Sequence, residues 1–222
     1  MYKLGTLKDL EGKYKNREFI VLGAGSTIKE FKSEIEAFIK DKNLISIGIN
    51  NVSTQIVPDL HLWTNNKRLK RFCRSIKPQS ELLLGSNIKV TTTEYVEEVI
   101  GNFAFFRIDY IDNFGYVGQD PERGILKGEF RTAGLLAIRI ACYLGSKTVY
   151  VAGMDGYTLN YNGDQHCYGF GPTDSQDEKY CQEKDEIVKK QLDKFYWAHM
   201  NVKIITPTVF EEFYDKDILC KY

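Results

Sequence analysis

Residues 130–157 constrain the fold more than any other stretch of this chain. They open with Phe130-Arg131-Thr132-Ala133-Gly134, continue as an apolar helical pattern to Leu144-Gly145, and end in a hydrophobic strand pattern at 148–152 followed by Gly153-Met154-Asp155. Small residues at a helix start, a glycine stop and a buried strand make one unit of an α/β fold. In open α/β sheets, ligands bind at the carboxyl ends of the strands. The segment therefore predicts a binding crevice beside Asp155.

A second strand–glycine–helix unit lies near the amino terminus, where Gly23-Ala24-Gly25-Ser26-Thr27 follows an apolar run at 18–22. Glycines let the backbone approach a phosphate, and the free N–H groups of a helix start favour an anion. A tight turn needed only for packing explains the same residues. The dinucleotide motif Gly-x-Gly-x-x-Gly is incomplete because position 28 is Ile, which disfavours NAD.

The rest of the chain alternates short apolar runs with amphipathic stretches, as βαβ units do. The expected strands are 18–22, 44–49, 60–63, 81–84, 103–108, 148–152 and 202–205. The expected helices run from the N-cap Ser26 to about Lys40, from about Asn66, from Thr132 to Leu144 and from Gln176 to about Met200, with a short terminal helix opened by Pro207. Flexible loops are expected near 113–129 and 157–176. The chain therefore predicts one α/β domain over residues 1–222, three-layered and Rossmann-like, with a mostly parallel sheet and helices on both faces.

Composition narrows the class of protein. The 222 residues include 30 basic and 30 acidic side chains, so the net charge of zero argues against nucleic acid as a partner. The basic run 67–74 is either a solvated helix face or a phosphate or membrane-surface patch. No apolar signal region or membrane span is recognisable, which predicts a cytoplasmic protein. The five cysteines form no Cys-x-x-Cys pair, so neither a disulfide framework nor a zinc site is expected.

Polar residues follow the second and third expected strands. Asn50 and Asn51 stand where an amide can meet a ribose or a base edge, although a simple turn pair is equally consistent with them. Thr64 ends the third expected strand and can face the same crevice. Thr132 is either part of an anion pocket or the N-cap of its helix, and Gly134 then permits close packing.

Three residues are candidates for chemistry. Arg131 can neutralise a leaving phosphate or pair with Glu129. Asp155 can bind a metal, orient a hydroxyl or cap backbone amides. His166 has the best context of the three histidines for acid–base work, because Tyr157 and Tyr168 stand in the same expected loop. No cluster of His, Asp and Glu has metal-ligand spacing.

These motifs together resemble a known family. Strand–Gly-x-Gly-Ser–helix, Ile49-Asn50-Asn51, Arg131-Thr132-Ala133-Gly134 and Leu144-Gly145-x-x-x-Val149-Tyr150-Val151-Ala152-Gly153-Met154-Asp155 look like the bacterial family 42 sialyltransferases. They are also similar to the related domain of archaeal 6-hydroxymethylpterin diphosphokinases and of flagellin-glycosylating motility accessory factors. The resemblance extends over roughly residues 18 to 205.

The sialyltransferase resemblance implies a CMP-activated nonulosonic acid as donor, a glycan or glycolipid acceptor, no cofactor and no metal, in bacterial surface-glycan synthesis. It implies that the nucleotide is held by Gly23, Gly25, Ser26, Asn50 and Asn51, that the donor pocket is lined by Thr132, Ala133 and Gly134, that the phosphate meets Tyr157 and Tyr168, and that the general base is His166. Two alternatives stay open: a diphosphokinase in which Asp155 helps to hold Mg²⁺, and a non-catalytic nucleotide-binding module. Contact with the inner face of a membrane and formation of a homo-oligomer are also left open.

Overall fold

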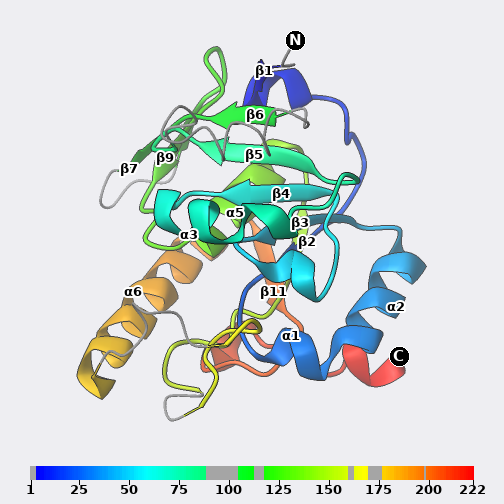
Figure 1. Ribbon diagram of the computed structural model, residues 1–222, viewed down its shortest axis with the longest axis vertical. Helices are drawn as coiled ribbons and strands as arrows, with labels where there is room; N and C mark the ends of the chain where they lie inside the picture. The colour runs from blue at the N-terminus through cyan, green and yellow to red at the C-terminus, as the bar shows by residue number, and fades with distance from the viewer. Residues whose placement is uncertain (1–3, 89–104, 113–117, 160–162, 170–176, 198) are drawn as a thin grey trace.

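Eight parallel strands form one sheet in the order β1-β6-β5-β4-β3-β2-β10-β11 (Figure 1). The structure is a computed structural model, which describes residues 4–88, 105–112, 118–159, 163–169, 177–197 and 199–222. The strands of this sheet are β1 (Leu4–Thr6), β2 (Phe19–Leu22), β3 (Ile45–Ile49), β4 (Leu60–Trp63), β5 (Glu81–Gly85), β6 (Phe105–Ile108), β10 (Thr148–Ala152) and β11 (Asn201–Ile204). A smaller sheet has the order β7-β9-β8 and contains β7 (Tyr110–Asp112), β8 (Gly118–Asp120) and β9 (Ile125–Gly128).

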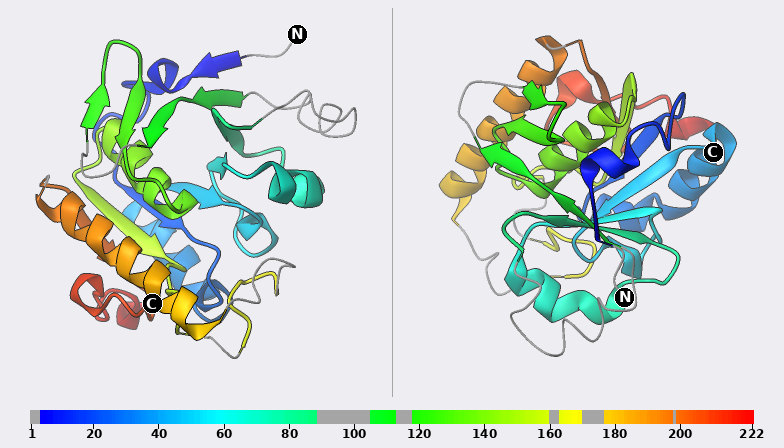
Figure 2. Two further views of the ribbon diagram at one scale, coloured as in Figure 1. Left: turned by 90° about the vertical axis from the view of Figure 1, so that its left-hand side faces the viewer. Right: turned by 90° about the horizontal axis from the view of Figure 1, so that it is seen from above.

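Helices cover both faces of the large sheet, as Figure 2 shows for α3 and α5. The α-helices are α1 (Thr27–Glu30), α2 (Lys32–Lys42), α3 (Asn66–Phe72), α5 (Ala133–Tyr143) and α6 (Glu178–Trp197). Alternation along the strands explains the two covered faces, because successive side chains of a strand point to opposite sides. Val21 packs in the cluster that contains Leu135 of α5, whereas its neighbours Ile20 and Leu22 pack with Ile28 of α1. The predicted three-layer, Rossmann-like fold is confirmed.

No helix in the described part of the chain is long and apolar enough to cross a membrane.

The expected strand 60–63 has the predicted bounds, and the others agree within a few residues; positions 103 and 104 lie outside the described residues.

The strand order reverses direction between β2 and β10, and this switch point places the ends of both strands side by side. The chain moves outward from β2 to β6 in one direction and from β10 to β11 in the other. At the carboxyl ends, the Gly23 N–H donates to the Ala152 carbonyl at 2.7 Å and the Gly25 N–H donates to the Gly153 carbonyl at 2.9 Å. Ligands of open α/β sheets bind at such a point.

The first expected helix is not continuous. Phe31 leaves helical geometry, with φ −107° and ψ 23°, and separates α1 from α2. Ser26 precedes α1, but its side chain makes no capping hydrogen bond to the helix. Ser26 therefore occupies the expected N-cap position without a side-chain cap, and the expectation of one continuous helix was wrong.

The glycine-rich segment near 113–129 was expected to be loop, yet it contains β8 and β9. These strands pair with each other antiparallel as neighbours in the chain, and β9 pairs parallel with β7, so pairing between nearby strands outweighs the loop-like composition. The described parts of the second expected loop, 157–159 and 163–169, form no strand or helix beyond an isolated bridge; residues 113–117, 160–162 and 170–176 lie outside the described part.

Two terminal elements also differ from expectation. Strand β1 was not anticipated; it pairs parallel with β6 at the edge of the sheet. Pro207 does not open a helix, and short 3-10 helices begin only at Glu211 (Glu211–Phe213) and Leu219 (Leu219–Lys221). Thr206 and Thr208 instead tie this segment to the end of β10, because their hydroxyls contact the Gly153 N–H and the Met154 carbonyl at 2.9 and 2.7 Å.

Candidate functional site

A cavity of about 310 Å³ lies at the switch point, beyond the carboxyl ends of β2, β3, β4 and β10. The structure brings together on its wall thirteen of the residues that the sequence singled out, namely Gly23, Ala24, Gly25, Asn50, Thr64, Arg131, Thr132, Ala133, Gly134, Gly153, Asp155, Tyr157 and His166. They meet because the ends of parallel strands share one edge of the sheet.

Four predicted site residues do not line this cavity. Ser26 and Thr27 are buried beneath it, where their side chains contact Asp155. Asn51 is also buried, and its carboxamide oxygen accepts a hydrogen bond from the Ser75 hydroxyl. Tyr168 stands behind His166. The polar groups of these four residues thus contact neighbouring protein groups beside the cavity.

Asp155 joins the two glycine units. Its carboxylate accepts hydrogen bonds from the Thr27 N–H at 3.0 Å, from the Thr27 hydroxyl and from the Ser26 hydroxyl at 3.3 Å. Burial raises the pKa of Asp155, and these hydrogen bonds oppose the rise. The carboxylate thus caps the start of α1 from a residue far along the chain, which is the capping role that the sequence left open. Within the described residues, no three side chains of His, Cys, Asp or Glu form a group suited to a metal ion.

Asn50 presents an unused amide to the cavity. It follows β3 in a left-handed conformation with φ +50°, which Asn tolerates better than most residues. Its N–H donates to the Leu62 carbonyl at 3.3 Å, and its carbonyl accepts from Nε2 of His61. The residue is only 6% exposed, and its side-chain amide has no hydrogen-bond partner among the residues that the structure describes.

Helix α5 points its amino-terminal end at the cavity. Thr132 is the N-cap, as one of its two predicted readings required, and its hydroxyl oxygen accepts from the Leu135 N–H at 3.3 Å. The first N–H groups of a helix have no intrahelical partner and favour an anion. Ala133 and Gly134 carry such groups and line the cavity. A Cβ on Gly134 would lie 2.7 Å from the Met154 side chain, so glycine also permits the close packing.

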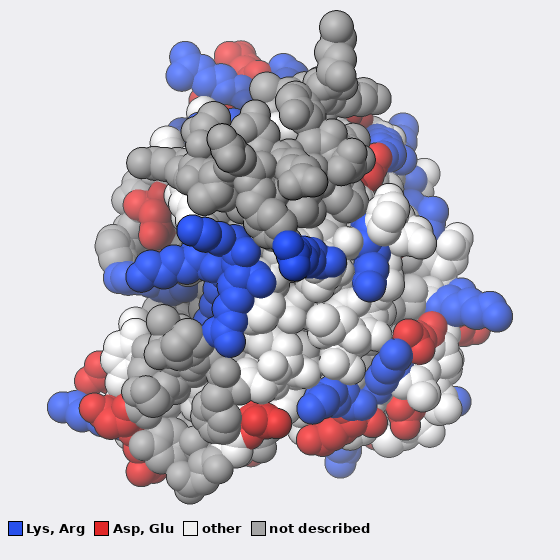
Figure 3. All heavy atoms as spheres, viewed as in Figure 1, with Lys and Arg blue, Asp and Glu red and all other residues white. Residues whose placement is uncertain are grey.

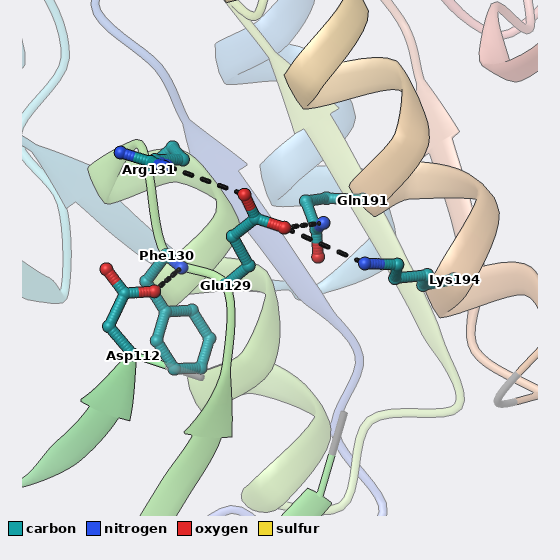
Figure 4. Close-up of polar contacts among 6 residues, drawn as sticks. All are labelled: Asp112, Glu129, Phe130, Arg131, Gln191 and Lys194. Atoms are coloured by element: carbon teal, nitrogen blue, oxygen red, sulfur yellow. Dashed lines mark hydrogen bonds and ion pairs between the residues drawn. The ribbon is translucent and has the colours of Figure 1, made fainter. Parts of the chain in front are cut away.

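Glu129 controls the setting of Arg131 (Figure 4). The carboxylate is buried and receives Nε of Arg131 at 3.4 Å, the Gln191 side-chain amide, and Nζ of Lys194 at 3.7 Å. Arg131 thus forms the ion pair with Glu129 that the sequence suggested. Arg131 also lines the cavity. Because Gln191 and Lys194 belong to α6, these contacts of Glu129 connect the segment before α5 to that helix.

Cationic residues outnumber carboxylates in the described lining of the cavity, and one of them, Arg131, is paired with Glu129 beside the lining. Three cationic residues contribute to it: Arg68 from α3, Arg131 before α5 and Lys184 from α6. Asp155 is the one carboxylate among the described lining residues, and its oxygens already accept the hydrogen bonds of Ser26 and Thr27. This balance favours an anionic ligand.

Some lining residues were missed by sequence reasoning. The sequence showed the basic run around Arg68 but not which of its members reaches the cavity. Arg68 is half-buried and lines the cavity. The other basic residues of α3 are exposed, and Figure 3 shows basic side chains clustered there: Lys67, Lys70 and Arg71. The other missed residues are Ile49, Asn65, Met154, Gly156, Gln165, Lys184, Val188 and Phe210. Lys184, Val188 and Phe210 follow no motif, so only the packing of α6 and the segment after β11 reveals them.

The backbone around His166 is fixed to the first glycine turn. His166 forms an antiparallel bridge with Gly25, and the Cys167 N–H donates to the Ala24 carbonyl at 2.8 Å. The imidazole stacks on the Tyr168 ring with 5.0 Å between ring centres, and the Tyr168 hydroxyl accepts from Nη1 of Arg68 at 3.2 Å. Tyr168 therefore supports His166 and Arg68 from behind.

His61 makes stability depend on pH. It is completely buried in β4, and burial lowers its pKa from 6.5 to about 4 although the hydrogen bond to Asn50 acts in the opposite direction. The unfolded chain binds a proton below about pH 6.5, whereas the folded protein does not do so until about pH 4. Stability should therefore fall as the pH decreases through this window. We expect His61 to remove about 2 kcal/mol of stability between pH 8 and pH 5.

Denaturant unfolding of the unaltered protein and of His61→Phe between pH 4 and pH 8 tests this expectation. The difference between the two free energies of unfolding isolates the histidine from other titrating groups. A difference that does not change with pH would contradict a neutral buried His61.

Comparison with known proteins adds no family assignment. No family model matches the chain, and no significant match to a curated protein was found.

Proposed function

We propose that the protein is a glycosyltransferase that uses a nucleotide-activated sugar, with CMP as the expected nucleotide. The observation that carries the proposal is the cavity at the switch point, whose described lining contains three cationic residues, one carboxylate and the amide residue Asn50. An amide can both donate to and accept from a ribose or a base edge. A nucleotide matches this site because it combines such groups with a phosphate.

The phosphate of the donor fits the start of α5. The N–H groups of Ala133 and Gly134, together with Arg131, supply hydrogen bonds and positive charge at one side of the cavity. Gly23 and Gly153 also line the cavity, and their backbones pack closely against each other. Charge that develops on a leaving phosphate is stabilised by such fixed donors.

The chemical step assigned to this site is a substitution at the anomeric carbon of the donor sugar. An acceptor hydroxyl oxygen bonds to that carbon while the bond from the carbon to the phosphate oxygen breaks. The bonding electron pair leaves with the phosphate of CMP, and His166 takes the proton of the hydroxyl as general base. Arg131 compensates the charge of the departing phosphate. Support for His166 is its place on the cavity wall, fixed by Gly25 and Tyr168.

The role of Asp155 bears on the alternative of Mg²⁺-dependent phosphoryl transfer. A metal-binding carboxylate directs free oxygen lone pairs at the ion, but both oxygens of Asp155 accept hydrogen bonds from Ser26 or Thr27. This arrangement favours the reading in which Asp155 holds the scaffold of the cavity. We therefore favour glycosyl transfer over phosphoryl transfer. The acceptor that we propose is a glycan or glycolipid, as the sequence resemblance implies.

A thermal-shift series tests the proposal. We expect CMP to raise the unfolding temperature more than CDP, UDP, GDP or ATP do, with and without Mg²⁺. At a concentration of a hundred times its dissociation constant, a ligand adds about 2.7 kcal/mol of stability, which is readily measured. The matched control is Asn50→Ala, in which the CMP response should weaken. A response to no nucleotide overturns the proposal, and a response to ATP that requires Mg²⁺ favours phosphoryl transfer.

A further inference from the structure

His61 is a buried histidine that faces the back of the cavity wall without lining it. It lies in β4 and is completely buried, with its ring 4.9 Å from the Trp63 ring. Its Nε2 is in hydrogen-bond contact with the Asn50 carbonyl, and Nδ1 has no partner among the described residues. A carbonyl oxygen only accepts hydrogen bonds, so Nε2 must carry the proton.

Contacts from β4 fix the backbone of Asn50. Asn enters the left-handed region more readily than most residues, and neighbouring groups can fix it there. Two contacts from β4 do so here, the Leu62 carbonyl on the Asn50 N–H and the His61 imidazole on the Asn50 carbonyl. In this conformation Asn50 is one of the residues that line the cavity.

We propose that His61 is a positioning residue of the binding site, which fixes the Asn50 peptide through Nε2–H and thereby presents the Asn50 amide to the nucleotide. This inference rests on the proposed nucleotide site. His61 itself touches no ligand, so its contribution to binding passes through Asn50.

A double-mutant cycle separates positioning from a structural role. With CMP as the probe, His61→Phe should bind about tenfold more weakly, because the donor is lost while the buried ring is kept. His61→Gln should restore part of the affinity, since its amide nitrogen can replace Nε2. In an Asn50→Ala background, His61→Phe should cause no further loss. Additive losses, or unchanged affinity in His61→Phe, would overturn the proposal.

A core control and a ligand-free measurement complete the test. Leu82→Ala removes buried volume from the same cluster as Trp63 and should lower stability without weakening CMP binding by the folded protein. In the unliganded protein, NMR should show a neutral imidazole with the proton on Nε2, and His61→Phe should accelerate hydrogen exchange of the Asn50 N–H at least tenfold more than Leu82→Ala does. A proton on Nδ1, or equal acceleration in the two variants, overturns the positioning role. If CMP binds neither the unaltered protein nor any variant, the proposed function fails. The NMR and hydrogen-exchange measurements on the unliganded protein then decide the role of His61 by themselves.

Discussion

Replacing His166 by Ala is expected to reduce glycosyl transfer by about 10²- to 10⁴-fold while leaving CMP binding unchanged. General-base catalysis acts on the acceptor hydroxyl, so its loss lowers the rate of transfer and not the affinity for the nucleotide. The structure supports this separation because the groups assigned to the nucleotide, Asn50 after β3 and the start of α5, belong to other segments of the cavity wall than His166. The measurement is release of CMP from a CMP-activated nonulosonic acid in the presence of a panel of hydroxyl acceptors.

Two controls make the His166 result interpretable. His199→Asn changes an exposed histidine that does not line the cavity, and Asn suits its left-handed backbone with φ +59°; it should retain full transfer activity. Tyr168→Phe removes the hydroxyl that Arg68 contacts but keeps the ring on which His166 stacks, and should lower the rate less than His166→Ala does. Full turnover by His166→Ala would assign the proton transfer to another group. Weakened CMP binding in that variant would place His166 in the nucleotide site instead.

The sequence was informative about the fold and the strand ends because their signals are local. Strand β4 could be placed at Leu60–Trp63 because this short run follows the turn signal Pro58-Asp59, and β2 could be placed within one residue. Parallel strands end at one edge of a sheet, so Gly23, Asn50 and Thr64 were expected to share a crevice, and they do. The N-cap reading of Thr132 rests on the same kind of local chemistry.

Contacts between distant segments account for what the sequence could not supply. Nothing adjacent to Asp155 reveals that its carboxylate caps α1 more than a hundred positions earlier in the chain. Strands β8 and β9 are short and lie in a glycine-rich segment whose composition is typical of a loop, although they pair with each other and β9 also pairs with β7. Lys184 and Phe210 reach the cavity from α6 and from the segment after β11. Tyr168 shares its loop with His166, yet only the ring stack and the contact with Arg68 distinguish a supporting residue from a ligand contact.

The close backbone approach between β2 and β10 makes Gly23 the position where the smallest substitution should have the largest effect on stability. A Cβ at this position would lie 2.2 Å from the Gly153 carbonyl oxygen and 2.6 Å from its carbonyl carbon. Backbone atoms at the end of a buried strand cannot rotate away as a side chain can, so the strand ends must separate. That separation would break the hydrogen bond from the Gly23 N–H to Ala152, which is 2.7 Å long. We expect Gly23→Ala to lower the free energy of unfolding by about 3 kcal/mol or more.

Gly12→Ala is the matched control for this substitution. Gly12 has φ +79° and no atom within 4 Å of an added Cβ, so Ala there costs only the strain of the left-handed backbone, about 1–2 kcal/mol. Urea unfolding of both variants measures the two losses, and CMP titration of the folded fraction reports on the cavity. Gly23→Ala should lose stability beyond Gly12→Ala and also bind CMP more weakly, because moving Gly23 away from Gly153 displaces Ala24 and Gly25 on the cavity wall. Equal losses in the two variants would mean that the strand ends relax around a methyl group. Glycine at position 23 would then not be required for the close packing of β2 against the end of β10.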